Sequence, residues 1–284
     1  MMTEYRLLNI DDGSFERAVS FAWSRCTDVS QRSYLMFADR QEAEDEFSKV
    51  MADPDSQLVG CYDGSQLVGV MSLAVEPQEH YLQTTGFYYD RRHPQVIDLF
   101  IGQLEHGYPG CTAYVGLPYE NRAVAGRLAA HGFGLVNDCS DMRRAMAGWD
   151  GGAGGGRGVR DVGPSDWPRY AAYHDRVFPG IYYDSVHLAA EADRFVVLAL
   201  YDGTAIGGAL FMKTGCSPCA EVFGLHAPDQ PGARALLHAA LERLPPQDAV
   251  VFMVDQDDAV SMAAALAEGL RCTSRYICYA KDII

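Results

Sequence analysis

The sequence predicts an α+β (mixed α/β) protein built from two similar domains, each with a mostly antiparallel sheet flanked by helices. One observation is a Gly-rich stretch near the middle of the 284 residues, at 147–160. So much glycine disfavours both helix and strand and is typical of a flexible linker. A second is an Asp-Gly pair between two apolar runs on each side of it, at Asp63-Gly64 and Asp202-Gly203. This pattern indicates a β-hairpin.

The third observation is a constant spacing between matching residues in the two halves. Three pairs share an offset of 137: Pro94 with Pro231, Leu104 with Leu241, and Gly132 with Gly269. An offset kept across several predicted elements indicates an internal duplication. We therefore expect domains at 1–147 and 159–284, joined by a linker at 148–158.

Hydrophobic periodicity predicts the elements of the first half in order. We expect a strand at 5–8, helices at 15–23 and 41–51, strands at 57–62, 66–75 and 81–89, a helix at 95–106, a strand at 111–117, a helix at 120–131 and a final hairpin at 133–146. Asp12 or Ser14 is expected to cap the first helix, and Gly132 to end the last one.

The second half repeats this order. We expect a strand at 159–160, a helix that begins at 165–168 with Ser165 as its cap, strands at 196–201, 205–212 and 220–226, a helix at 233–243, a strand at 249–254, a helix at 258–268 and a strand at 274–281. In both halves the helices would cover a mostly antiparallel sheet.

Composition narrows the function. Hydrophobic residues make up 48% of the chain, which excludes a disordered protein. The net charge of −15 argues against a nucleic-acid partner and is compatible with either a cationic ligand or simple solubility. Neither an apolar run of roughly 18 residues nor a signal peptide is recognisable, so we expect a cytoplasmic protein with no membrane partner. A homodimer is left open.

Most of the eight cysteines lie in apolar runs, where cysteine behaves as a small hydrophobic residue. Cys216-Ser-Pro-Cys219 differs, because a CxxC pair can be redox-active or form half of a zinc site. It has no second CxxC or nearby Cys/His pair, so we favour a turn and expect no metal.

Two stretches resemble the GNAT (GCN5-related) acyl-CoA N-acyltransferase fold. Residues 221–241 are similar to the strand, pyrophosphate loop and helix of that family, and Asn121 to Phe133 resembles its later helix closing in Gly-Phe. With the element order, the resemblance covers nearly the whole chain twice. It implies a tandem GNAT protein that uses acetyl-CoA as co-substrate to acetylate an amine of a small molecule or peptide.

For the chemistry, the resemblance implies a general base on the strand that faces the thioester, where Glu221 and His226 are the candidates. Alternation from Glu221 places Phe223 and Leu225 on its face and His226 on the other, unless a bulge intervenes. Tyr279 is the candidate acid, with Tyr276 as an alternative.

The remaining site residues are also implied by position. The cofactor-binding set comprises Phe223 and Leu225 on the strand and the backbone amides of Gln230, Gly232, Ala233 and Arg234 at the pyrophosphate. The acceptor loop would contribute Tyr182, Tyr183 and Asp184, which suit an ammonium group. In the first half, Arg91 and Arg92 offer side-chain charge to a phosphate, and Phe87–Asp90 is a second acceptor candidate. A capped turn and a packed loop are the structural alternatives.

Some residues depart from the family pattern. Pro231 stands where the first loop glycine is expected and has no N–H to donate. The family tyrosine that acts as general acid falls on Leu128 in one half and on Ala265 in the other, and neither transfers a proton. These departures support an alternative, a catalytically inactive tandem GNAT scaffold that binds a ligand or a protein partner.

Overall fold

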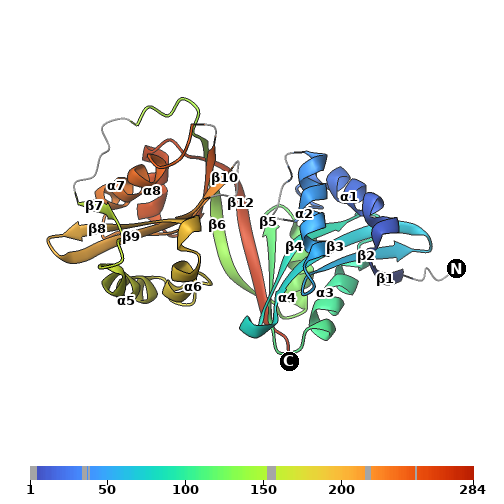
Figure 1. The fold of residues 1–284 in the computed structure, drawn as a ribbon. Helices are drawn as coiled ribbons and strands as arrows, with labels where there is room; N and C mark the ends of the chain where they lie inside the picture. The colour runs from blue at the N-terminus through green and yellow to red at the C-terminus, as the bar shows by residue number, and fades with distance from the viewer. Residues whose placement is uncertain (1–4, 34–36, 38, 152–157, 215–218, 247) are drawn as a thin grey trace. The chain divides into compact units, whose positions relative to one another are not determined.

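The computed structural model describes residues 5–33, 37, 39–151, 158–214, 219–246 and 248–284 (Figure 1). The chain divides into two compact units. The first unit comprises residues 1–138 and 275–284, and the second comprises 139–274. Among the described residues, no helix is long and apolar enough to cross a membrane.

The first unit is an α/β layer structure. Its elements are β1 (Tyr5–Asn9), α1 (Asp12–Cys26), α2 (Arg40–Ala52), β2 (Gln57–Asp63), β3 (Gln66–Glu76), η1 (Pro77–Glu79), β4 (Tyr81–Tyr89), α3 (Gln95–Gly107), β5 (Thr112–Pro118) and α4 (Arg122–Ala130), with most of β12 (Arg271–Asp282). The strand order is β1-β2-β3-β4-β5-β12. All of these neighbours are antiparallel except β4 and β5.

The second unit follows the same plan. Its elements are β7 (Val159–Asp161), α5 (Trp167–Val177), α6 (Ser185–Ala190), η2 (Ala192–Arg194), β8 (Phe195–Asp202), β9 (Ala205–Lys213), β10 (Cys219–His226), α7 (Gln230–Leu241), β11 (Ala249–Asp255) and α8 (Ala259–Ala267), with most of β6 (Gly134–Ala145). The strand order is β6-β11-β10-β9-β8-β7, and only β10 and β11 are parallel.

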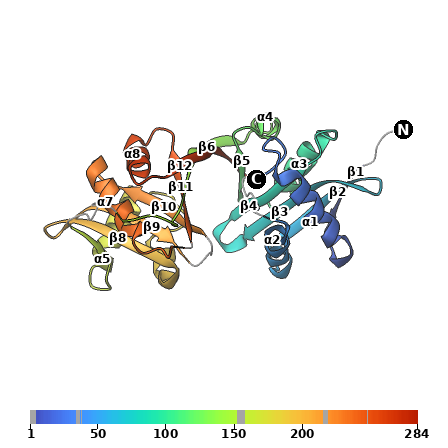
Figure 2. The ribbon, with the colours of Figure 1, turned by 90° about the horizontal axis from the view of Figure 1, so that it is seen from above.

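Each sheet is covered by helices on both faces, which confirms the predicted fold class. In the first unit, α1 and α2 pack on one face around Phe47 and Tyr88, and α3 packs on the other around Phe100 (Figure 2). In the second unit, α7 and α8 cover one face around Leu236, and α5 and α6 cover the other around Phe211 (Figure 1). Burying apolar side chains on both faces is the main stabilising contribution to such layers.

The end of the first half departs from the prediction. The expected hairpin at 133–146 is wrong, because 134–145 forms the single strand β6, which pairs with β11 from Cys139 to Ala145. In turn β12, from the end of the chain, pairs with β5 in the first unit. Each sheet is thus completed by the strand that ends the other half. The compact units therefore do not coincide with the expected domain boundaries at 147 and 159. Those boundaries remain a prediction about the repeated part of the sequence.

The predicted C-terminal ends of two helices are confirmed, whereas the predicted N-caps of two others are wrong. Gly132 and Gly269 follow α4 and α8 with φ angles of +82° and +79°, a backbone conformation that glycine adopts without strain. The cap of α1 is Asp11, not Asp12 or Ser14, and it accepts a hydrogen bond from the Ser14 N–H at 2.9 Å. The expectation that Ser165 caps α5 is also wrong, because α5 begins at Trp167.

Candidate active site

The strands β10 and β11 pair only along the first half of β10. Their parallel ladder runs over four residue pairs, from Cys219–Ala249 to Val222–Phe252. On its other side, β10 changes register with β9 between Val222 and Gly224, so Phe223 is the extra residue of a β-bulge. Bulges re-aim side chains and are over-represented next to active sites.

This bulge corrects the expected alternation. Across the ladder Glu221 lies opposite Lys213, and His226 lies opposite Ala209, four residues earlier on β9. Residues that pair across strands share a face, as do residues two and four apart on one strand. Glu221 and His226 therefore share a face, whereas Leu225 packs on the opposite face with Leu236. The alternation predicted without a bulge therefore does not hold: the bulge that the sequence left open is present, and it turns Leu225 away from the face of Glu221 and brings His226 onto it.

Glu221 has the protonation properties of a general base. Its side chain is half-buried, and burial raises the pKa of Glu221 to about 7. Asp141 raises this pKa further, while the cations of Lys213 and Arg143 oppose the shift. A carboxylate with a pKa near neutrality gains and loses a proton readily at physiological pH.

Lys213, which the sequence analysis missed, lies in an aromatic wall beside Glu221. Its ammonium donates a hydrogen bond to the Tyr183 hydroxyl and lies 4.6 Å from the centre of the Tyr183 ring. The same nitrogen is 5.5 Å from the Phe195 ring centre and 3.6 Å from the Glu191 carboxylate. Phe223 packs edge-on against Tyr183, with ring centroids 4.9 Å apart. The wall thus already accommodates one ammonium group by cation–π contact.

His226 lies at the exposed end of β10. Its Nδ1 shares a 2.9 Å hydrogen bond with the Tyr173 hydroxyl of α5. The two rings also meet edge-on, with centroids 5.8 Å apart. This contact orients the imidazole, which lies on the face that carries Glu221.

The N-terminus of α7 differs from the predicted pyrophosphate loop. Asp229 is the N-cap, and its carboxylate accepts a hydrogen bond from the Gly232 N–H at 2.8 Å. The Ala233 N–H donates to the Asp229 carbonyl at 3.0 Å. Pro231 contributes no donor. Two of the four amides assigned to a phosphate are therefore engaged by Asp229, while Gln230 is exposed at the first turn.

The side chain of Arg234 binds a carboxylate of the same unit. Its Nε donates to the Glu268 carboxylate at 2.7 Å, and the other oxygen of Glu268 lies 2.9 Å from Nδ1 of His238. Glu268 and His238 are buried, with 5% and 2% exposure. This network ties α7 to the end of α8, so it gives Arg234 a structural role.

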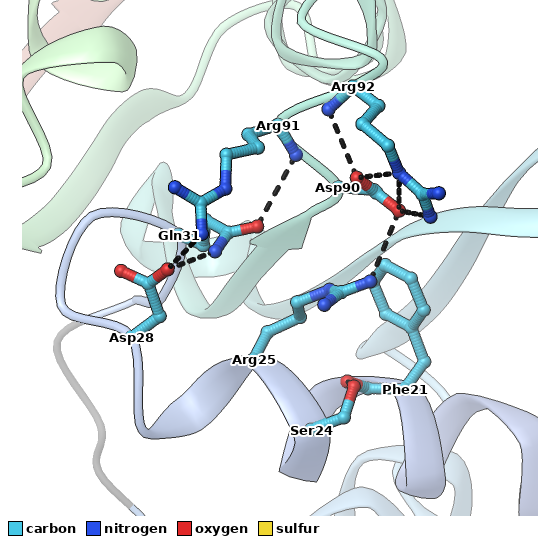
Figure 3. Close-up of polar contacts among 8 residues, drawn as sticks. All are labelled: Phe21, Ser24, Arg25, Asp28, Gln31, Asp90, Arg91 and Arg92. Atoms are coloured by element: carbon cyan, nitrogen blue, oxygen red, sulfur yellow. Dashed lines mark hydrogen bonds and ion pairs between the residues drawn. The ribbon is translucent and has the colours of Figure 1, made fainter.

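The corresponding helix of the first unit, α3, begins at a cluster of arginines (Figure 3). The N-cap of α3 is Pro94, which makes no side-chain cap hydrogen bond. Arg92 and Arg25 both bind the buried Asp90, at 2.6 and 3.1 Å. Hydrogen bonds from Arg92, together with the charge of Arg25, lower the pKa of Asp90 to about 2.

The third arginine of this cluster is Arg91, which pairs with Asp28 at 3.4 Å (Figure 3). Arg91 and Arg92 are largely exposed, with side-chain exposures of 73% and 71%. Three guanidinium groups thus face two carboxylates beside a helix N-terminus, which favours an anion.

Comparison with solved structures decides the fold. A GCN5-related N-acetyltransferase from Sphaerobacter thermophilus matches with a TM-score of 0.66 and 13% identity, over 98% of this chain and 96% of that one. A tandem GNAT protein from the clavulanic acid biosynthesis pathway matches with a TM-score of 0.58 and 14% identity, over 98% of both chains. The chain has the tandem GNAT fold. No family model and no curated protein sequence matches it.

Within this GNAT fold the candidate acid Tyr279 belongs to the first unit, whereas Glu221 belongs to the second. Leu128 and Ala265, at the positions of the family tyrosine, are fully buried apolar residues. Tyr279 belongs to β12, where it pairs with Val115 of β5 and packs against the first-unit core. The structure does not bring Tyr279 together with Glu221 in one unit.

The expected acceptor loop of the second GNAT unit is partly structural. Asp184 is the N-cap of α6 and accepts hydrogen bonds from the Val186 and His187 N–H groups, both at 2.9 Å. Tyr182 stacks on the imidazole of His187. Only Tyr183 reaches the wall around Lys213.

The CxxC pair falls only partly within the described residues. Cys216 lies outside them, and Cys219 is half-buried at the start of β10, where burial raises the pKa of its thiol to about 11. No group of His, Cys, Asp and Glu suited to a metal ion occurs in the part of the chain that the structure describes.

Proposed function

We propose that the protein is an acyl-CoA-dependent N-acyltransferase in which Glu221 is the general base. The single observation that supports this most is the half-buried carboxylate of Glu221, whose pKa is about 7. Glu221 lies on β10, next to the point where this strand bulges and separates from β11. The GNAT fold of the solved relatives is consistent with it. The acetyl donor would be acetyl-CoA, which supplies the acyl group as a thioester.

The residues around Glu221 suit an amine acceptor. Amines are mostly protonated at neutral pH and must lose a proton before they act as nucleophiles. Glu221 is poised to accept that proton, and His226 offers a second acceptor on the same face. The Phe223 ring beside Tyr183 offers apolar surface to the acceptor, whereas the Tyr183 face already binds the Lys213 ammonium. The acceptor is therefore an amine of a small molecule or peptide.

The N-terminus of α7 suits the CoA pyrophosphate less well than the residues around Glu221 suit an amine. At α7 a phosphate would have to replace the Asp229 carboxylate at the Gly232 N–H, and the negative charge of Asp229 opposes it. The backbone amides of Gln230, Gly232, Ala233 and Arg234 remain our proposed contacts. We therefore expect weak CoA binding at the second unit.

The test measures CoA release from acetyl-CoA with a panel of primary amines, for the wild-type protein and for Glu221→Gln. Glutamine keeps the shape of the side chain but does not accept a proton near neutral pH. Turnover by the wild type that falls by about 10²- to 10⁴-fold in the variant supports the proposal. Equal turnover in both would assign the base elsewhere.

A specific observation favours a second candidate function, an inactive tandem GNAT scaffold. Asp229 fills the place of a phosphate at α7, and Leu128 and Ala265 replace the acid. Measuring the melting temperature with and without acetyl-CoA distinguishes the acyltransferase from the inactive scaffold. A ligand at about 100 times its dissociation constant adds roughly 2.7 kcal/mol of stability. No shift at millimolar acetyl-CoA and free CoA would favour the scaffold.

A further inference from the structure

The second unit contains a cavity of about 400 Å³ that no function discussed above uses. The cavity lies beyond the end of β7. Because β7 pairs only with residues 198–200 of β8, residues 195–197 have no strand neighbour on the side of β7. The loop after β7, the first turn of α5, the end of α6 and the residues of η2 form the rest of its wall. Cavities of roughly 300–1,000 Å³ are of the size that holds small molecules.

The wall of this cavity is aromatic and aliphatic. Trp167 and Phe195 contribute rings, and Pro164, Ala189 and several valines contribute apolar surface. A cavity of about 150 Å³ with an apolar lining is already large enough to hold one benzene ring. The available volume therefore accommodates a group of one or two rings, and it is too small for a protein helix.

The charge at the cavity is balanced. Asp161 is the only ionisable residue among those that line it. Both oxygens of Asp161 accept hydrogen bonds from Arg243, at 2.7 and 3.0 Å, and these bonds hold the pKa of Asp161 below its ordinary value. A cationic ligand would therefore find the Asp161 carboxylate already paired with Arg243, and an anionic ligand would be repelled by that carboxylate. The cavity suits an uncharged group.

One residue connects the cavity with the aromatic wall beside Glu221. Phe195 is only 8% exposed and lines the cavity. Its ring also contacts the Tyr183 ring edge-on, with centroids 4.9 Å apart, and lies 5.5 Å from the Lys213 ammonium. A ligand against Phe195 is therefore one ring away from the residues that surround the candidate base.

We propose that this cavity is a binding site for an uncharged aromatic group of one or two rings. The group is either part of the amine substrate or a separate small molecule. Either source brings a flat ring against the wall to which Trp167 and Phe195 belong, where ring contacts add to the burial of apolar surface.

The test uses indole as the probe and fluorine NMR as the readout. The chain has three tryptophans, so labelling with 5-fluorotryptophan gives three resonances. Trp167→Phe identifies the one from Trp167. Indole is expected to shift that resonance saturably and to leave those of Trp23 and Trp149 unchanged. No saturable shift at millimolar indole would overturn the proposal.

Two variants of neighbouring exposed alanines on α6 locate the site. Ala189→Phe fills the cavity and is expected to weaken indole binding by about tenfold or more, a loss of about 1.4 kcal/mol in binding free energy. Ala190→Phe adds the same ring at a position that does not line the cavity, and it should bind indole as the wild type does. Equal binding by both variants would overturn the assignment.

Activity measurements, together with an NMR titration of an aromatic amine, decide whether the ring belongs to the substrate or to a separate ligand. If the ring belongs to the substrate, 2-phenylethylamine shifts the Trp167 resonance, is acetylated, and has a raised KM in Ala189→Phe. If the ring is a separate ligand, indole binds without competing with the amine. Absence of all turnover would count against the proposed acyl transfer, and the indole titration would still decide whether the cavity binds a ring.

Discussion

The Asp229 carboxylate accepts the N–H of Gly232 at 2.8 Å, so an acidic side chain caps the helix N-terminus at which we propose that the CoA pyrophosphate binds. Asparagine caps helices about as well as aspartate but carries no charge. We therefore predict that Asp229→Asn preserves stability and tightens CoA binding several-fold, measured by isothermal titration calorimetry at low salt. Unchanged affinity would mean that α7 does not bind the pyrophosphate.

A matched variant in the first unit tests the other helix N-terminus. Arg92→Gln removes one exposed guanidinium from the cluster beside α3. If CoA binds near Glu221, this variant should bind CoA as the wild type does. A several-fold loss of affinity in Arg92→Gln would place CoA in the first unit and would contradict the assignment of Glu221 as base. The tighter binding by Asp229→Asn should weaken with added salt, since it acts through charge.

The raised pKa of Glu221 predicts a dependence of stability on pH. Burial raises the pKa from 4.5 to about 7, so between these values the folded chain binds more protons than the unfolded chain. Stability from this group is therefore present at low pH and is lost as the pH rises through 7. Glu221→Gln should melt close to the wild type near pH 5 and several °C higher near pH 8, measured by calorimetry. A wild-type advantage at pH 8 would contradict the pKa shift.

Lys213 should set the pH at which the proposed acyl transfer appears. Its charge lowers the pKa of Glu221, so removing that charge raises the pKa further. We predict that kcat/KM of the wild type rises with pH to a plateau above about 7, and that Lys213→Met moves this rise to higher pH. Lys213→Arg keeps the charge and should keep the wild-type profile. Identical profiles in all three proteins would remove Lys213 from the site.

The sequence carries most of the secondary structure but only part of this site. The Asp-Gly hairpins and the apolar periodicity place the strands around Glu221 within one or two residues of their observed ends. The face of His226 depends on the bulge at Phe223, which shifts every later side chain to the other face. The isolated Gly224 inside a strand was a signal for that bulge.

Other parts of the site depend on tertiary contacts. Asp229, three residues before Gly232, has the spacing of an N-cap and was recognisable as one. Lys213 was not recognisable as a site residue from the sequence. Its position opposite Glu221 follows from the register of β9 with β10, which the local pattern does not determine. The pairing of β12 with β5 was also beyond the local pattern, since a strand at the end of the chain is compatible with either sheet.

The glycine that follows α8 and a glycine inside α4 should respond differently to substitution by alanine. Gly269 has a φ of +79°, and a Cβ there would lie 1.9 Å from Nη1 of Arg144, which donates to the Glu268 carbonyl. Gly269→Ala should destabilise by about 1–2 kcal/mol from the left-handed backbone alone. Gly126→Ala, at an exposed and open position inside α4, should instead stabilise by roughly 0.5–1 kcal/mol. Urea denaturation measures both, and equal effects would contradict the cap.

The C-terminal strand predicts an asymmetric effect of truncation. Ending the chain after Ser274 removes the part of β12 that pairs with β5, together with the buried Ile277 and Ile283. These residues belong to the first unit, whereas 139–274 keeps the whole second unit. Calorimetry should therefore show loss of one transition and retention of the other. Trp23 should report the loss, and Trp167 the retained unit.

Deleting Ile284 alone is the control for this truncation, because that residue is fully exposed and packs in neither core. Its removal should leave both transitions unchanged. Unpaired β5 would also present an open edge in the truncated chain, which favours aggregation. The measurement therefore needs low protein concentration and a check by light scattering. If both transitions disappear together without aggregation, the second unit depends on the first for its stability, and the exchanged strands join the two into one cooperative structure.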